Sequence, residues 1–251
     1  MKFLGIIPAR YASTRFPGKP LADLMGKPMI RRVYERVVDL LDRVVVATDD
    51  ERILNAVRQW GGGALLTSPD HPSGTDRCLE AYWKLKEEYD VIINIQGDEP
   101  FIHPSQIELL KTAFQNPATS IATLVKPFSP DDDFENLFNP NTPKVVLNSK
   151  GQAIYFSRSI VPYIRGKHHS EWLKSHVFYK HIGIYAYKPK VLEEITSLPP
   201  SILEKAESLE QLRWIENGYV IQAMITNEET IGIDTPDDLE KAVKIIMNYE
   251  L

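Results

Sequence analysis

A cluster of cationic and hydroxyl side chains directly follows the first apolar run of the chain, in residues 8–20, which read PARYASTRFPGKP. Its cations are Arg10, Arg15 and Lys19, and its aliphatic hydroxyls are Ser13 and Thr14. Phosphate oxygens bind well to charged donors and to the backbone amides of such loops. The loop therefore predicts a polyphosphate site, with a solvated basic loop as the alternative. It is not a Walker A loop, because a proline follows Gly18-Lys19.

Two aspartates stand in loops that are suited to holding a divalent cation. Asp98 follows the apolar run 91–95, and Asp234 precedes Thr235 and Pro236. Pro236 fits the first turn of a helix with Thr235 as its N-cap, so Asp234 is not needed for the cap. Mg²⁺ takes one or two carboxylates and leaves its other positions to phosphate and water. The pair is thus a candidate Mg²⁺ site, with a turn or a helix cap as the alternative role for Asp98.

Other polar residues give weaker signals. Residues 72–77 read PSGTDR and open a predicted helix, so their amides are candidates for contacts with a base or a ribose. Ser and Thr are equally good helix caps at these positions. The six histidines lack the spacing of a zinc site, and the sequence supports no Ser/His/Asp or Cys/His catalytic arrangement.

Composition narrows the class of protein. The 251 residues are 43% hydrophobic and 25% charged, which is typical of globular domains and excludes a disordered or collagenous chain. A net charge of −5 argues against a nucleic-acid binder. Cys78 is the single cysteine, which suits a reducing compartment. No apolar run approaches the roughly 20 residues of a membrane span, and the run 3–7 is too short for a signal peptide. We expect a soluble, cytoplasmic protein.

The elements that must position these residues alternate along the first half of the chain. Short apolar runs predict strands at residues 3–7, 44–47, 64–66, 91–95 and 121–125. Helical periodicity fills the intervals between them, and residues 91–93 are apolar on both faces, as in a central parallel strand. The pattern predicts an α/β fold with a doubly wound, mostly parallel sheet. Ligands bind beyond the carboxyl ends of such strands, which is where residues 8–20 and Asp98 stand.

The second half of the chain has a different pattern. Residues 127–143 are rich in Pro, Asp and Asn and predict an irregular connection. The following predictions are a β-hairpin at 145–147 and 153–157, an extended stretch at 176–187, a helix near 209–216, a strand at 219–225 and a final helix from 236. We expect one domain over 1–251. Its nucleotide-binding half covers about 1–126, and a β-rich insertion covers about 127–187.

The motifs, taken in order, resemble those of the 3-deoxy-manno-octulosonate cytidylyltransferase family, also called the CMP-Kdo synthetases. The resemblance covers nearly the whole chain, and the ordered set is far more specific than any one motif. The motifs are IIPARYASTR at 6–15, GKPMI at 26–30, VATD at 46–49, SGTDR at 73–77, NIQGDEP at 94–100, KVV at 144–146, IYFSR at 154–158, HIGIY at 181–185, LEQLR at 209–213 and GIDTP at 232–236.

The resemblance implies a Rossmann-like nucleotidyltransferase fold and a reaction of CTP with the sugar acid Kdo that gives CMP-Kdo and pyrophosphate for lipopolysaccharide synthesis. It implies Mg²⁺ as the cofactor, held by Asp98 and Asp234. The implied catalytic residues are Arg10, Arg15, Lys19, Asp98 and Asp234. The implied nucleotide-binding residues are Pro8, Ala9, Arg10, Ser13, Thr14, Arg15, Lys19, Ser73, Gly74, Arg77, Gln96 and Asp98.

The resemblance also implies sugar-acid binding by Arg158, His181, Tyr185, Glu210, Gln211 and Arg213. Arg158 is the best candidate for the sugar carboxylate, because a carboxylate suits a guanidinium fork. Core packing is the alternative for Tyr185, and an i,i+3 surface pair is the alternative for Glu210 with Arg213. The implied partners are CTP and Kdo, and the implied assembly is a homodimer formed through the insertion, with no nucleic acid or membrane.

Two other functions stay open at this point. One is a cytidylyltransferase for another sugar acid, either 8-amino-Kdo or N-acetylneuraminate. We do not expect the runs 95–100 and 156–158 in enzymes for N-acetylneuraminate. The other is a non-catalytic module that binds CTP. The presence of Lys19 with both Asp98 and Asp234 argues against such a module.

Overall fold

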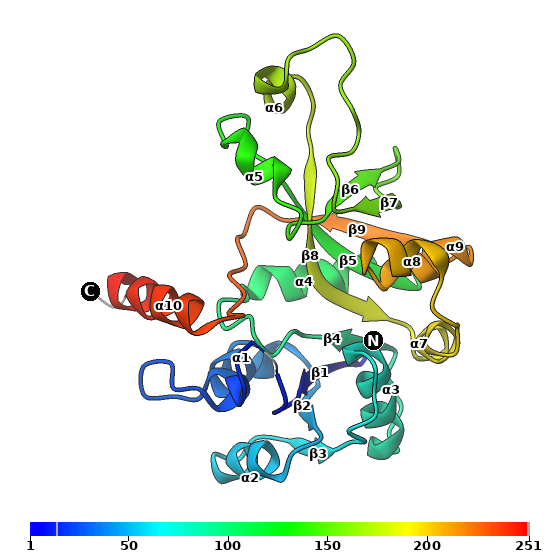
Figure 1. The fold of residues 1–251 in the computed structure, drawn as a ribbon. Coiled ribbons are helices and arrows are strands. Elements are labelled where there is room, and N and C mark those ends of the chain that lie inside the picture. Colours follow the sequence, from blue (N-terminus) through cyan, green and yellow to red (C-terminus); the bar gives the residue numbers. More distant parts are fainter. Residues whose placement is uncertain (14, 250–251) are drawn as a thin grey trace. The chain divides into compact units, whose positions relative to one another are not determined.

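The apolar runs near the N-terminus form parallel strands in the computed structural model, which describes residues 1–13 and 15–249. The strands are β1 (Phe3–Ala9), β2 (Arg43–Thr48), β3 (Ala64–Leu66) and β4 (Val91–Asn94). They pair in the order β3-β2-β1-β4 (Figure 1). Each lies within two residues of its predicted bounds. Residues 91–93 are fully buried, as the run that is apolar on both faces predicts.

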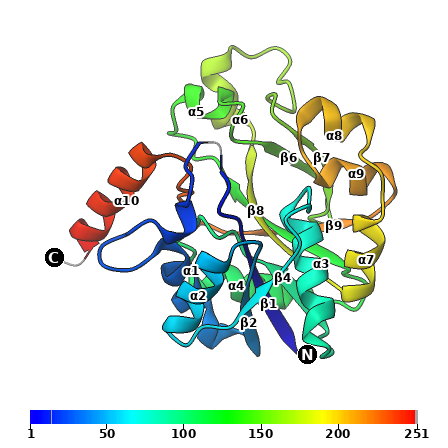
Figure 2. The ribbon, with the colours of Figure 1, turned by 60° about the horizontal axis from the view of Figure 1, so that its bottom comes forward.

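Helices cover both faces of these four strands. They are α1 (Met29–Val37), α2 (Glu51–Gln59) and α3 (Gly74–Leu85), with short 3₁₀ turns at Lys19–Leu21 and Val38–Leu40. The chain moves outward from β1 to β3 and then crosses back to β4. With right-handed crossovers, α3 therefore lies on the opposite face from α1 and α2 (Figure 2). The fold is α/β and doubly wound, as predicted.

The strands and helices belong to two compact units. The first comprises Met1–Glu108, Ala186–Thr196 and the chain from Thr230, and the second comprises Leu109–Tyr185 and Ser197–Glu229. The contacts thus divide the chain near residue 108 and give the first unit three separate stretches of sequence. The prediction of one domain, divided by function near residue 126, stays a prediction, because these units are defined by contacts and not by what they bind.

The last stretch of the chain completes the first unit. Its helix α10 (Pro236–Tyr249) begins where the sequence predicts a helix. The Thr235 hydroxyl accepts from the Asp238 amide at 3.3 Å and donates to the Asp238 carboxylate at 2.8 Å, so Thr235 is the cap. Ile233 and Ala242 join a buried apolar cluster with Leu24 and Met29. Helix α7 (Pro189–Thr196) packs on α3 within the same unit (Figure 2).

The second unit is built on strands of mixed direction. The parallel pair is β5 (Ile121–Pro127) and β9 (Ile221–Ile225), and β5 also lies beside β8 (Tyr179–Tyr187). The predicted hairpin is confirmed as the antiparallel pair β6 (Lys144–Leu147) and β7 (Ala153–Ser157). At its turn Gly151 has a φ of 72°, which favours glycine.

Several short helices were not predicted from the sequence. They are α5 (Phe134–Phe138), α6 (Trp172–Ser175), α8 (Ile202–Glu207) and the 3₁₀ turn His169–Glu171, alongside the predicted α9 (Gln211–Glu216) and the longer α4 (Pro104–Ala113). The irregular connection predicted at 127–143 thus contains one helical turn and a half. Apolar side chains of α5, α6 and their neighbours form a separate buried cluster. No helix among the described residues is long and apolar enough to cross a membrane.

Candidate active site

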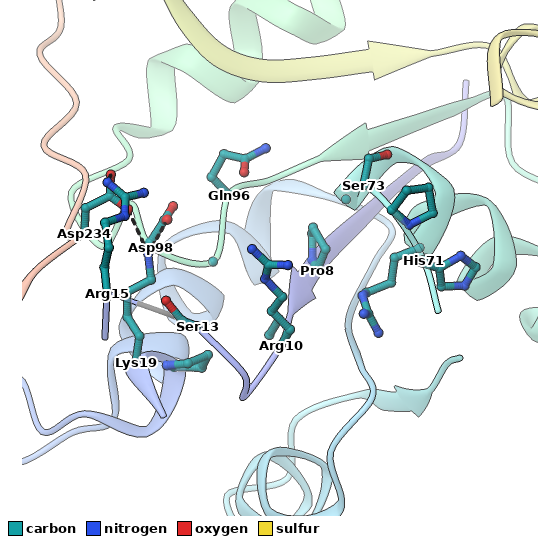
Figure 3. A pocket seen from close by; sticks show the side chains of 16 residues that line it. Pro8, Arg10, Ser13, Arg15, Lys19, His71, Ser73, Gln96, Asp98 and Asp234 are labelled. Carbon is teal, nitrogen blue, oxygen red and sulfur yellow. Dashed lines mark hydrogen bonds and ion pairs between the residues drawn. The ribbon is translucent and has the colours of Figure 1, made fainter. Parts of the chain in front are cut away.

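A pocket of about 290 Å³ opens in the first unit at the carboxyl ends of β1 and β4 (Figure 3). Strands β2 and β3 lie on the far side of β1, so the direction of strand order changes between β1 and β4. In doubly wound sheets this change of direction leaves a crevice for ligands. The location therefore agrees with the ligand site that the strand pattern predicts.

All the described residues that were predicted to be catalytic or to bind the nucleotide line this one pocket. They are Pro8, Ala9, Arg10, Ser13, Arg15, Lys19, Ser73, Gly74, Arg77, Gln96, Asp98 and Asp234. Thr14 lies outside the described residues. The structure thus brings together side chains that are more than 200 positions apart in the sequence, while the role of each stays a prediction.

The first loop closes on itself before it reaches Lys19. The Gly18 amide donates to the Tyr11 carbonyl at 2.9 Å. Gly18 has a φ of 72°, and a Cβ at this position would lie 3.0 Å from the Tyr11 ring, so glycine is required twice over. The Arg52 guanidinium of α2 stacks on the same ring, 3.3 Å from its centroid. This packing fixes the loop that carries Arg10 and Arg15.

Lys19 connects the two aspartates. Its ammonium donates to Asp98 Oδ2 at 2.6 Å and to Asp234 Oδ1 at 3.2 Å (Figure 3). Arg15 forms an ion pair with Asp234 Oδ2 at 3.2 Å. The two loops are also joined through the backbone, because the Ile233 amide donates to the Asp98 carbonyl at 2.9 Å. Asp98 thus stands in a turn, as one alternative predicts, and its side chain pairs with a cation.

This arrangement suits a divalent cation. Oxygens of Asp98 and Asp234 lie within 3.2 Å of one nitrogen, so the two carboxylates are close enough to bind one cation together. The described residues contain no group of three or more His, Cys, Asp or Glu side chains that could hold a metal. A cation at the pair would need further ligands from a bound anion and water, which is the usual environment of Mg²⁺ beside phosphates.

Arg77 and Ser73 support the opposite side of the pocket. Arg77 is buried and donates to the Thr67 hydroxyl at 2.6 Å and to the Asp49 carboxylate at 2.9 Å. Ser73 caps α3, accepting from the amides of Thr75 and Asp76 at 3.1 and 3.2 Å. The capping alternative for Ser73 is thus confirmed, although the residue lines the pocket as well. Arg77 contributes a positive charge to the pocket lining, and its contacts with Thr67 and Asp49 fix the position of that charge.

Four lining residues were not among the predicted site residues: Pro20, His71, Pro72 and Gly97. A Cβ at Gly97 would lie 3.0 Å from the Pro8 carbonyl oxygen, so this loop approaches β1 too closely for any side chain. The signal for His71 was its place immediately before Pro72 and Ser73. The histidines were considered only as possible zinc ligands, which is why His71 was not predicted.

The predicted sugar-acid residues all belong to the second unit, where β8 and α9 carry most of them. His181 Nε2 lies 3.1 Å from the Thr123 hydroxyl, and its ring lies 5.2 Å from the Tyr185 ring. Tyr185 is buried against Trp214, as the core-packing alternative predicts, and burial followed by the nearby Glu210 charge raises its pKa well above 10. The structure thus brings His181 and Tyr185 together.

Gln211 is also buried, and its amide nitrogen has no hydrogen-bond partner among the described residues. A buried amide without a partner costs free energy, so such a group is suited to a ligand hydroxyl or carboxylate. Gln211 is therefore the member of the predicted sugar-acid set with the clearest unused hydrogen-bonding capacity.

The two predicted arginines have protein partners. Arg158 donates to the carbonyls of Glu207, Pro140 and Ser208, at 2.6, 3.0 and 3.2 Å. These contacts use three of the five N–H donors of its guanidinium. Arg213 forms a buried, bidentate ion pair with Glu204, at 2.8 and 2.6 Å, and donates to the Leu198 carbonyl at 3.0 Å. Its bidentate partner is therefore Glu204, and the pair with Glu210 that was considered as an alternative is not its main contact.

The burial of His181 predicts how stability responds to acid. Burial lowers the pKa of this imidazole from 6.5 to about 3. Below pH 6.5 this imidazole becomes protonated in the unfolded chain but stays neutral in the folded chain. The free energy of unfolding therefore falls as the pH drops from 6.5 toward 3. We expect His181→Gln to flatten this part of the stability profile, measured by urea unfolding at a series of pH values. His176→Gln, an exposed histidine of the same unit, should leave the slope unchanged. An unaltered slope in both variants would contradict the prediction.

Comparison with known proteins identifies the family. Residues 4–231 match the cytidylyltransferase family model. The chain is 70% identical over 249 residues to the 3-deoxy-manno-octulosonate cytidylyltransferase of Parabacteroides distasonis, covering 99% of each chain. It is 62% identical to the protein of the same name from Phocaeicola vulgatus, covering 100% of this chain and 99% of that protein.

Solved structures agree with these relatives. The fold matches a CMP:2-keto-3-deoxy-manno-octonic acid synthetase complexed with CTP, with a TM-score of 0.89, 45% identity and full coverage of both chains. A 4-diphosphocytidyl-2C-methyl-D-erythritol synthase from Anaerococcus prevotii shares the fold alone, with a TM-score of 0.62 and 13% identity over 98% of this chain and 99% of that one. These relatives match the chain over almost its whole length, and its strand order and its pocket at the ends of β1 and β4 agree with them. The chain belongs to the 3-deoxy-manno-octulosonate cytidylyltransferase family.

Proposed function

We propose that this protein transfers the cytidylyl group of CTP to 3-deoxy-manno-octulosonate (Kdo), giving CMP-Kdo and pyrophosphate for lipopolysaccharide synthesis. The main support is the pocket at the ends of β1 and β4, where Lys19 and Arg15 form ion pairs with Asp98 and Asp234. A triphosphate requires cations for its oxygens and carboxylates for its accompanying metal, and this pocket contains both. Relatives that cover the whole chain carry the name of this reaction.

The chemistry needs positioning and charge neutralisation more than a covalent step. The anomeric hydroxyl of Kdo attacks the α-phosphorus of CTP and loses its proton to solvent, and the bond from this phosphorus to the bridging oxygen of pyrophosphate breaks. Arg10, Arg15 and Lys19 stabilise the negative charge that accumulates on the departing pyrophosphate. Arg15 and Lys19 already lie beside Asp98 or Asp234, so their ammonium and guanidinium groups are held in place before the nucleotide binds.

We propose Mg²⁺ as the divalent cation, with Asp98 and Asp234 as its protein ligands. The pair fits because the two carboxylates converge on one point and nearby phosphates can complete the coordination. When bound, Mg²⁺ would neutralise phosphate charge and lower the pKa of a coordinated hydroxyl. The nucleoside end of CTP is assigned to Pro8, Ala9, Ser73, Gly74 and Gln96, with Arg77 behind them.

For the sugar acid we propose His181, Tyr185, Glu210 and Gln211 as contacts of the second unit. Arg158 keeps two N–H donors beyond its three carbonyl contacts, and these can donate to a carboxylate in a forked arrangement. Arg213 is better explained as a support of the unit, because its guanidinium is paired with Glu204.

We also propose a cytoplasmic homodimer that associates through residues 127–187. This region exposes large apolar side chains beside the cluster of α5 and α6, among them Phe138, Tyr163 and Val177, which are 63%, 70% and 53% exposed. Side chains of this size gather at association surfaces more often than on monomer surfaces.

The test is pyrophosphate release from CTP and Mg²⁺ with Kdo, 8-amino-Kdo and N-acetylneuraminate offered in parallel. We expect the largest kcat/KM with Kdo. Release with Kdo near the background rate would overturn the proposal. Faster release with 8-amino-Kdo or N-acetylneuraminate would keep the reaction class and correct the substrate. Binding of CTP without release with any sugar acid would identify a non-catalytic CTP-binding protein.

A further inference from the structure

His71 lies in the nucleotide pocket at the end away from the aspartates. It lines the same pocket as Pro8 and Ser73, whereas Asp98 and Asp234 lie at the other end (Figure 3). If the triphosphate is held beside the aspartates, the opposite end receives the nucleoside. The side chain of His71 is 19% exposed, so it is largely enclosed by the protein.

A fixed carboxylate orients the imidazole. His71 Nε2 contacts Glu80 Oε2, which also accepts from the Ser68 amide at 2.8 Å. The second oxygen of Glu80 forms an ion pair with Lys84 at 2.7 Å. Burial raises the pKa of Glu80, but the hydrogen bonds from Lys84, Ser68 and His71 outweigh it and lower the pKa to about 2. Glu80 is therefore ionised at neutral pH and can only accept.

The position of one ring hydrogen follows from this contact. Because an ionised carboxylate has no proton to give, the Nε2 atom of His71 must carry the hydrogen. In the neutral ring the other nitrogen, Nδ1, is then a hydrogen-bond acceptor. Nδ1 has no hydrogen-bond partner among the residues that the structure describes. His71 thus lines the pocket with one ring nitrogen held by Glu80 and a second that is an available acceptor in the neutral ring.

We infer that His71 is a further nucleoside-binding residue, with Nδ1 accepting a hydrogen bond from the nucleoside, and that Glu80 is its positioning residue. The group that donates is a ribose hydroxyl or the exocyclic amino group of cytosine, which share the required N–H or O–H. This inference rests on the proposed function, because it takes CTP as the ligand of the pocket. It adds to the predicted set a contact that reads a neutral part of the nucleotide.

The first test separates binding from catalysis. His71→Phe keeps a ring but removes both nitrogens, and we expect it to raise the KM for CTP about 5- to 10-fold with kcat changed less than about 2-fold. His71→Asn retains a polar group near the Nδ1 position and should recover part of this loss. His103→Phe, another histidine of the first unit outside the pocket, is the matched control. A loss in kcat at constant KM would overturn the inference.

The second test asks whether Glu80 acts through His71. Glu80→Gln removes the negative charge that holds the ring proton on Nε2, so the ring is no longer fixed with Nδ1 as its acceptor. We expect the KM for CTP to rise about as much as in His71→Phe, and to change less than about 2-fold when Glu80→Gln is added to His71→Phe. Glu35→Gln is the matched control, since Glu35 also forms two ion pairs on a helix surface. Additive effects would overturn the role of Glu80.

The third test identifies the donor on the nucleotide. Dissociation constants of CTP, 2′-deoxy-CTP, 3′-deoxy-CTP and UTP are measured by calorimetry for the unaltered protein and for His71→Phe and His71→Asn. A penalty that disappears with one analogue supports the inference and names the group, whether a hydroxyl or the amino group. An equal penalty with all four nucleotides would overturn it. Turnover of CTP and Kdo by the unaltered protein decides the proposed function separately.

Discussion

Replacing Asp98 with asparagine lowers pyrophosphate release by at least about 100-fold while the protein stays folded, if the pair of carboxylates holds Mg²⁺. The amide keeps the shape of the side chain but has no charge for a divalent cation. Folding is expected to change little, because Lys19 keeps Asp234 as a partner and partly exposed ion pairs contribute about 1 kcal/mol or less. The measurements are turnover across a range of Mg²⁺ concentrations and direct Mg²⁺ binding by calorimetry in the presence of CTP.

Asp234→Asn should behave in the same way, since its carboxylate meets the same lysine. The matched control is Asp237→Asn, an exposed aspartate in the first turn of α10, three positions further along. We expect the control to retain its rate and its Mg²⁺ affinity. Near-normal rates for Asp98→Asn or Asp234→Asn at limiting Mg²⁺ would show that the altered carboxylate is not a metal ligand.

Replacing Arg213 with methionine destabilises the protein by about 3 kcal/mol, because it leaves Glu204 buried without its partner. The side chains of Arg213 and Glu204 are only 9% and 15% exposed, so solvent screens the pair little. The measurement is urea unfolding at neutral pH. The double variant Arg213→Met with Glu204→Gln should lose less than Arg213→Met alone, because no uncompensated charge then stays buried.

The same variant decides between the two roles of Arg213. If Arg213 only supports the second unit, Arg213→Met at low temperature keeps a normal KM for Kdo once the folded fraction is accounted for. A raised KM for Kdo in fully folded protein, with stability unchanged, would restore Arg213 to the sugar-acid site and contradict the structural role. Arg158→Ala is the useful comparison, since Arg158 retains free N–H donors.

Acid provides an independent check on the pair. Burial raises the pKa of Glu204, but the Arg213 hydrogen bonds lower it below 4.5 on balance. The stabilisation is therefore present above the pKa of the unfolded chain and is lost as the pH falls through the lower folded value. Arg213→Met has no such ion pair to lose in acid. Its free energy of unfolding should therefore fall less steeply below about pH 4.5 than that of the unaltered protein.

The strands of the first unit could be predicted because each is a short apolar run with a helical interval behind it. The cap at Thr235 could be predicted because capping depends on residues three or four positions apart, here Thr235 and Asp238. The short helix α5 could not, since five residues give too little periodicity to recognise. Its start at Asp133, which accepts from the Glu135 amide, is the one local signal.

The pairings of the site were harder to predict than its membership. Arg213 takes its carboxylate from Glu204, nine positions earlier and on another helix, whereas sequence reasoning considered the neighbour at i−3. Lys144 is fully buried and donates to the carbonyls of Asn139 and Arg158, contacts that no spacing rule specifies. Which side chains come into contact depends on how helices and strands pack together, and local sequence patterns do not predict that packing. His71 was missed because the histidines were considered only as possible zinc ligands, although its partner Glu80 lies only nine positions later, in α3.

The return of the chain from Thr230 to the first unit has a consequence for biosynthesis. Lys19 is paired with Asp98, 79 residues later, and with Asp234, 215 residues later. A chain that emerges from the ribosome N-terminus first can therefore form β1 to β4 long before Asp234, the second carboxylate, has been synthesised. Until Ile233 and Ala242 arrive, Leu24 and Met29 lack two of the buried apolar side chains of their cluster. The newly made protein thus completes the charged groups of its pocket and this apolar cluster in a single late step. A chain interrupted before Thr230 would lack the second carboxylate and would leave the apolar cluster incomplete.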